Sequence, residues 1–159
     1  MSEIQYRTLT TDNSKLVSQL IQSVLHEFIE KDLSPDGFQL VLDDTDEASI
    51  QELFTNEKTI GYGASLNDRL IGVCVIRDWS HVHFLFVAGA YHRRGIAQAL
   101  FNLALADCLE KNPTLDILTV NSTLYAVDAY KKLGFVPIEN GYHQHLGGTF
   151  VSMEMRVKG

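Results

Sequence analysis

The chain has 159 residues, of which 45% are apolar, and a formal net charge of −7. This length predicts a single domain over residues 1–159, because domains commonly contain about 100–150 residues. The acidic balance excludes a typical nucleic-acid-binding surface, which needs a basic stripe. No apolar run approaches the roughly 20 residues of a membrane helix. Residues 1–5 also lack the basic and apolar regions of a secretory signal, so we expect a cytoplasmic protein with no membrane partner.

The N-terminal third predicts a short strand followed by helices. Residues 4–9 alternate loosely, as in an edge strand, and Asp12 is placed to cap the next helix. Apolar residues then recur at helical spacing over residues 16–29. The sequence Ser34-Pro35-Asp36-Gly37 interrupts this pattern, and its proline stands where a new helix could begin. A second helix is predicted around residues 48–54.

The middle of the chain predicts three consecutive strands. Residues 60–66 and 70–77 are apolar runs joined by a short polar link, which is a hairpin signal. Residues 81–87 form the third, and its second half is apolar at every position, as expected when both faces of a sheet are covered.

The remainder alternates between helix and strand. Helices are predicted over residues 94–109 and 123–133, and strands over 117–120 and 149–157. Consecutive strands are thus followed along the chain by a strand–helix–strand unit. This order of elements predicts an α/β fold with a mixed sheet.

The link between the third strand and the helix after it has the composition of an anion-binding loop. Residues 88–98 read Ala-Gly-Ala-Tyr-His-Arg-Arg-Gly-Ile-Ala-Gln. Small residues let backbone N–H groups approach a phosphate at a helix N-terminus, and two arginines add bidentate donors. Neither the P-loop nor the dinucleotide-binding spacing of glycines is present. An ordinary connection with two solvated arginines remains the alternative.

This loop resembles the pyrophosphate-binding motif of the GNAT superfamily of N-acetyltransferases, Gln/Arg-x-x-Gly-x-Gly/Ala. Gly95 and Ala97 match the motif, while His92 replaces its first residue. A second block, from Asn121 through Ala126 and Tyr130 to Gly134-Phe135, resembles the family's Asn…Ala-x-x-x-Tyr-x-x-x-Gly-Phe segment. The two motifs, in order and at normal separation, identify the chain as a member of that superfamily.

The resemblance implies a largely antiparallel, splayed sheet flanked by helices on both faces, with acetyl-CoA as cosubstrate. Pantetheine would lie where residues 85–87 part from residues 117–120, and an N–H near Phe86 or Val87 would polarise the thioester. Asn121 could bond pantetheine or cap a helix. The residues implied to bind the cofactor are Leu85, Phe86, Val87, His92, Arg93, Arg94, Gly95, Ile96, Ala97, Gln98, Asn121, Ala126 and Tyr130.

Three side chains are candidates for catalysis. Tyr130 matches the family's tyrosine that protonates the coenzyme A thiolate, although it could simply pack its helix on the sheet; Tyr125 is the fallback. His83 is the first candidate base for the amine and His81 the second, since alternation puts both on one side of the strand. The arylalkylamine N-acetyltransferases resemble this chain in the same His-x-His-x-Leu-x-Val pattern. Ordinary hydrogen-bonded histidines are the alternative.

No metal site is expected. A second histidine pair, His143 and His145, lies in a predicted loop without cysteine or carboxylate at ligand spacing. Cys74 and Cys108 stand in apolar runs and predict small buried hydrophobes.

The sequence thus predicts acetyl transfer from acetyl-CoA to a primary amine by direct attack. The acceptor, a small molecule or a peptide, is expected to approach between the N-terminal helices and the region of His143. Acidic residues near the end of the first helix could attract a cation or form a solvated face: Glu27, Glu30, Asp32 and Asp36. The family resemblance allows a homodimer. The rival hypothesis is a non-catalytic acyl-CoA-binding regulatory module.

Overall fold

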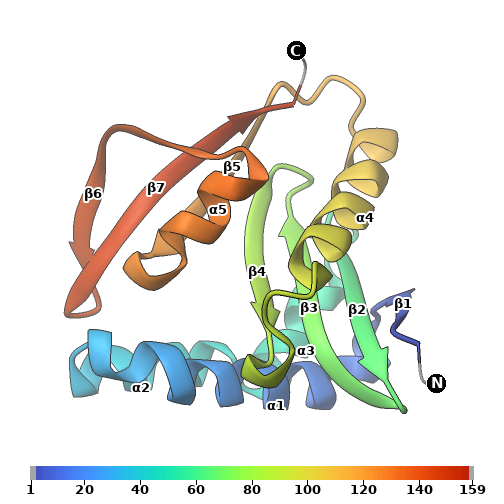
Figure 1. Ribbon diagram of the computed structural model, residues 1–159, viewed down its shortest axis with the longest axis horizontal. Helices are drawn as coiled ribbons and strands as arrows, with labels where there is room; N and C mark the ends of the chain where they lie inside the picture. Colours follow the sequence, from blue (N-terminus) through green and yellow to red (C-terminus); the bar gives the residue numbers. More distant parts are fainter. Residues whose placement is uncertain (1–2, 158–159) are drawn as a thin grey trace.

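A computed structural model describes residues 3–157 and contains one seven-stranded sheet, ordered β1-β2-β3-β4-β5-β7-β6 (Figure 1). Neighbouring strands are antiparallel except for β4 and β5, which are parallel. This confirms the predicted mixed, largely antiparallel sheet. The strands are β1 Gln5–Thr8, β2 Ile60–Leu66, β3 Arg69–Arg77, β4 His81–Val87, β5 Ile117–Thr123, β6 Val136–His145 and β7 Gly148–Arg156.

Helices cover both faces of the sheet, also as predicted. One core joins α4 and α5 to the sheet and includes Leu100, Phe101 and Phe135; the other joins α1 and α3 to Val73 and Val75. The helices are α1 Ser14–Val24, α2 Pro35–Asp44, α3 Glu47–Thr55, α4 Ile96–Lys111 and α5 Val127–Leu133. α1 continues into a π-helical turn, Leu25–Ile29. Within residues 3–157, none of the helices has both the length and the apolar character needed to cross a bilayer.

Two details differ from the sequence-based predictions, at the start of α1 and at residues 136–145. Asp12 does not cap α1: it lies in a 3-10 turn, Thr11–Asn13, that is capped by Thr10, whose side chain accepts from the Asp12 N–H, and the N-cap of α1 is Asn13. The proline begins a helix, α2, as its position indicated, and Ser34 caps that helix. Residues 136–145 form strand β6 rather than a loop, so His143 and His145 lie at the sheet's edge.

β4 and β5 part soon after they meet. Their pairing is limited to His81 with Thr119 and Val82 with Val120. Past Val82, the edge of β4 that would pair with β5 is therefore open. The implied splay of the sheet is present, and it leaves backbone groups of β4 without strand partners.

The register with β3 shows which backbone groups of β4 face this gap. The Ala88 N–H donates to the Ile71 carbonyl over 2.8 Å. In an antiparallel pair, residues bonded to the partner strand alternate with residues whose groups point away from it. Phe86 therefore bonds toward β3, whereas the N–H and C=O of Leu85 and Val87 face the gap. Of the two N–H groups expected to polarise a thioester, only that of Val87 is available.

Candidate functional site

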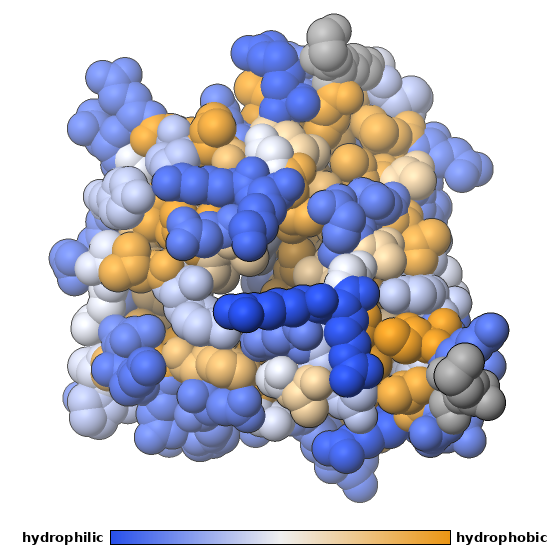
Figure 2. All heavy atoms as spheres, in the orientation of Figure 1, coloured by the Kyte–Doolittle hydropathy of each residue, from blue (hydrophilic) through white to orange (hydrophobic). Residues whose placement is uncertain are grey.

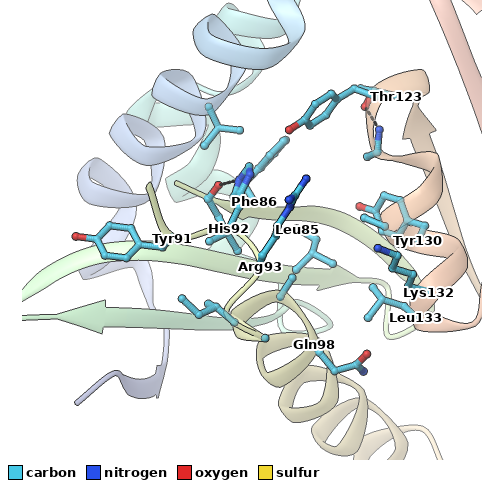
Figure 3. A pocket seen from close by; sticks show the side chains of 18 of the residues that line it. Leu85, Phe86, Tyr91, His92, Arg93, Gln98, Thr123, Tyr130, Lys132 and Leu133 are labelled. Atoms are coloured by element: carbon cyan, nitrogen blue, oxygen red, sulfur yellow. Dashed lines mark hydrogen bonds between the residues drawn. The ribbon is translucent and has the colours of Figure 1, made fainter. Parts of the chain in front are cut away.

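A cavity of about 500 Å³ opens beside the free edge of β4. It lies between the end of β4, the start of α4 and helix α5 (Figure 3), and a hollow with apolar surface is visible in this face of the molecule in Figure 2. The structure brings together these residues implied to bind the cofactor: Leu85, Phe86, Val87, His92, Arg93, Gly95, Ile96, Ala97, Gln98, Ala126 and Tyr130. Arg94 and Asn121 do not line the cavity.

The loop between β4 and α4 has the backbone of an anion cradle. Arg93 and Gly95 have positive φ angles of 65° and 77°, and Gly95 is the N-cap of α4. A helix start leaves its first N–H groups unpaired, and here these belong to Ile96, Ala97 and Gln98. A Cβ built on Gly95 would meet no atom within 4 Å, so open space lies above it. The helix dipole and the free donors favour an anion in that space.

The two loop arginines have different positions. Arg93 lines the cavity, and Figure 3 shows its side chain extending between β4 and α5. Arg94 instead holds its guanidinium 5.4 Å from the centre of the Tyr91 ring, outside the cavity lining. Arg93 is therefore the arginine better placed to contact a bound phosphate.

His92 closes the loop rather than projecting freely. Its Nε2 lies 2.6 Å from the Val87 carbonyl oxygen, which can only accept, so Nε2 carries the donated proton. The ring also stacks on Phe28, with centroids 5.1 Å apart, and Phe28 stacks at the same distance on Tyr125. This row of rings connects the π-helical turn after α1 to the loop and to the segment before α5.

Tyr130 projects from α5 toward the free edge of β4 (Figure 3), and the residue is 7% exposed. The ring packs edge-on against Phe135, at 5.5 Å. The hydroxyl makes no hydrogen bond within residues 3–157. Burial, with a smaller contribution from Cys74, raises the pKa of the phenol above its ordinary value. Tyr130 is therefore protonated at neutral pH and has a proton to donate.

His81 and His83 lie outside the cavity lining. His83 is the extra residue of a β-bulge, because Val82 pairs with Ile76 while Phe84 pairs with Val75. The bulge breaks the strict alternation from which one shared side was expected. His81 Nδ1 lies 2.7 Å from Thr119 Oγ1, and this contact joins β4 to β5.

The surroundings of His83 oppose protonation of its ring. Arg77 Nε donates to His83 Nδ1 over 3.3 Å. Desolvation by surrounding atoms, then the charges of Arg77 and His81, lower the pKa of His83 to about 4, although the residue keeps exposed surface. Its one basic nitrogen is thus already occupied by a donor.

Asn121 and the second histidine pair have structural contacts instead. The Asn121 side-chain oxygen accepts a 3.5 Å hydrogen bond from Ser152 on β7. His143 and His145 both contact the Phe150 ring, and His143 Nδ1 lies 2.8 Å from the Gly141 carbonyl. Within residues 3–157, no group of three or more His, Cys, Asp or Glu side chains is arranged around a common metal position.

The cavity also includes residues that the motifs did not single out. They are Val24, Ile29, Tyr91, Thr123, Ala129, Lys132 and Leu133, and they join Tyr125, the fallback candidate for the acid. Ala129 and Leu133 lie on α5 at helical spacing, beside Tyr130, so this face of α5 was a usable signal. Val24 and Ile29 come from the opposite layer, and no local pattern connects them to this site.

Residues 18–157 match the acetyltransferase (GNAT) domain family. The chain belongs to the GNAT acetyltransferase family. Acetyl-CoA-dependent acyl transfer is the reaction of this class of enzymes. The match includes both the loop at the start of α4 and the block that contains Tyr130.

Solved structures show the same GNAT fold. PaiA N-acetyltransferase from Thermoplasma acidophilum, in complex with coenzyme A, has a TM-score of 0.80 at 14% identity, over 97% of this chain and 99% of that one. A GCN5-related N-acetyltransferase from Rhodopseudomonas palustris has a TM-score of 0.78 at 18% identity, over 99% and 98%. An aminoglycoside 6′-N-acetyltransferase complexed with coenzyme A has a TM-score of 0.70 at 13% identity, over 98% of each chain. No curated protein sequence matches the chain significantly.

Proposed function

We propose that this GNAT protein transfers the acetyl group of acetyl-CoA directly to a primary amine, with Tyr130 as the general acid. One arrangement carries the proposal: the open edge of β4, the free N–H groups at the start of α4 and the Tyr130 hydroxyl all face one cavity. The anion site can hold the pyrophosphate of the cofactor, the backbone donor can polarise the thioester carbonyl, and the proton donor can protonate the leaving thiolate.

The residues present fit acetyl-CoA. The pyrophosphate would be held by the N–H groups of Ile96, Ala97 and Gln98 and by Arg93, in the open space above Gly95. Pantetheine amides would pair with the main-chain N–H and C=O of Leu85, which have no strand partner, while the Val87 carbonyl is held by His92. These contacts use the backbone and constrain side-chain identity little.

The chemistry follows from these positions. The Val87 N–H would stabilise the negative charge that develops on the thioester oxygen as the amine nitrogen attacks. The N–C bond forms, the C–S bond breaks, and the leaving thiolate takes the proton of Tyr130. The raised pKa of Tyr130 keeps that proton available at neutral pH.

Direct attack is favoured over an acetyl-enzyme intermediate. Cys74 and Cys108 are free but buried. Burial raises the pKa of the Cys74 thiol to about 12, and burial with the nearby charge of Asp107 raises that of Cys108 to about 11. Neither forms the thiolate that nucleophilic catalysis requires.

The attacking amine must also lose a proton, and His83 is poorly suited to accept it. For His83 to act as the base, Arg77 would have to release Nδ1, and a pKa of about 4 makes the ring a weak acceptor near neutrality. We therefore propose that solvent takes this proton, with His83 as the side-chain candidate that mutagenesis must test.

The deciding experiment combines the protein, acetyl-CoA and a panel of primary amines, and follows thiol release together with the mass of the products. We expect amine-dependent release and products heavier by one acetyl group. Coenzyme A binding without release for any amine would instead support a non-catalytic acyl-CoA-binding module. Absence of both binding and release would contradict the cofactor site itself.

A further inference from the structure

We infer that Glu27 selects acceptors that carry a second cationic group beside the reacting amine; this rests on the proposed acetyl transfer. Glu27 lies in the π-helical turn Leu25–Ile29. The turn places its carboxylate against Gly89, just past the end of β4, where a Cβ on Gly89 would overlap Glu27 Oε1. After desolvation, the charge of Glu27 is the second cause that raises the pKa of Tyr125. The carboxylate therefore lies at the end of β4, close enough to the cavity-lining Tyr125 to act on its hydroxyl, although Glu27 itself is outside the cavity lining.

This carboxylate has no partner in the described chain. Glu27 forms no ion pair or side-chain hydrogen bond within residues 3–157. Glu30, one turn further on, instead bonds to His26 at 2.7 Å. Glu27 is solvent-exposed, so a cation can reach it without displacing a bonded side chain.

Aromatic rings adjoin the carboxylate. Phe28 is stacked between His92 and Tyr125, with centroid distances of 5.1 Å to each. Its ring also lies against Gly89, since Phe28 Cζ would be 2.9 Å from a Cβ there. Both faces of Phe28 are covered by this stacking, so the Glu27 carboxylate supplies the attraction for an organic ammonium group, and the rings supply an apolar surface beside it for the carbon chain.

The bound cation is the second group of the acceptor rather than the reacting nitrogen. A carboxylate stabilises an ammonium ion and raises its pKa, which would oppose the deprotonation that attack requires. Gly89 is two residues past Val87, a span of at most about 7 Å along the chain. An aliphatic diamine can therefore place one ammonium at Glu27 and the other nitrogen at the thioester site beside Val87.

The test compares 1,4-diaminobutane with 1-aminobutane, which differ only in the second amino group. The kcat/KM of the diamine is divided by that of the monoamine for the wild type, for Glu27→Gln and for the matched control Glu30→Gln. The affinity of each protein for coenzyme A is measured in parallel. We expect Glu27→Gln to lower the diamine-to-monoamine ratio about tenfold, mainly through the KM of the diamine, while Glu30→Gln leaves it unchanged.

Each other outcome has a distinct meaning. An equal fall for both amines, mainly in kcat, would overturn the inference and indicate proton transfer by Glu27. An unchanged ratio in Glu27→Gln would also overturn it. If neither these two amines nor any other of the acceptor panel is acetylated by the wild type while coenzyme A still binds, the proposed function fails, and the inference fails with it.

Discussion

The Nε2 nitrogen of His92 donates a hydrogen bond to the Val87 carbonyl oxygen over 2.6 Å. This carbonyl faces the gap beside β4, so a loop side chain satisfies an acceptor that β5 does not reach. The N–H of the same residue remains open to a ligand. His92, the residue that departs from the family motif, therefore links the loop to the open edge of β4 and, of the two Val87 main-chain groups, leaves only the N–H free there.

Replacing His92 tests this positioning role. His92→Ala removes a hydrogen bond worth about 1 kcal/mol and should weaken coenzyme A binding about fivefold. His92→Gln keeps an amide donor and should retain most of the affinity. Isothermal titration gives both values; equal affinities for the alanine variant and the wild type would show that the contact does not support the site.

Replacing Tyr130 with phenylalanine separates chemistry from binding. Tyr130→Phe retains the buried ring and its contact with Phe135 but removes the hydroxyl. We expect kcat to fall about 100-fold or more, as for loss of a general acid, with coenzyme A affinity nearly unchanged. Tyr125→Phe is the matched control, and a larger loss of kcat in that variant would transfer the acid role to Tyr125.

Gly95 tests whether backbone conformation forms the anion cradle. No atom lies within 4 Å of a Cβ at this position, so a substitution is opposed by the φ angle of 77° rather than by crowding. A β-branched residue tolerates positive φ worst, and asparagine tolerates it best among non-glycine residues. Gly95→Val should weaken coenzyme A binding more than Gly95→Asn does, a ranking that titration calorimetry can establish. The reverse ranking would mean that coenzyme A affinity depends on the size of the side chain at residue 95 and not on the backbone conformation there.

The pH profile tests the histidine. A group whose pKa lies at about 4 is already deprotonated throughout the range from pH 6 to 9. The dependence of log kcat/KM on pH should therefore have the same shape in His83→Ala as in the wild type over that range. If the wild-type pH profile of log kcat/KM rises near pH 6–7 and this rise is absent in His83→Ala, His83 is the base and the account is wrong on this point. Because the folded pKa is below the ordinary value of about 6.5, His83 should also reduce the free energy of unfolding as pH falls from about 6.5 toward 4.

The sequence anticipated the elements that carry strong apolar patterns. The buried strands β3 and β4, helix α4 and the motif around Tyr130 all lie close to their predicted positions. Strand β6 was missed because its exposed positions hide the alternation and its pairing with β7 shifts between Pro137 and Tyr142. Helix α2 was only anticipated by its proline, since Gly37 and Phe38 are its buried residues.

The parts of the site that escaped prediction depend on tertiary contacts. A β-bulge at His83 leaves no signature in the local alternation, yet it decides where that ring points. The approach of Glu27 and Phe28 to Gly89 depends on how the layer of α1 packs against the end of β4. The choice between Phe86 and Val87 required the register with β3.

Residue-resolved amide hydrogen exchange by NMR, with and without coenzyme A, tests most directly the claim that the open edge of β4 holds the cofactor. The Phe86 N–H bonds toward β3 and should be protected in both states. The N–H groups of Leu85 and Val87 should exchange fast in the free protein and become protected in the complex, together with those of Ile96, Ala97 and Gln98. Coenzyme A binding that leaves Leu85 and Val87 unprotected would contradict the account.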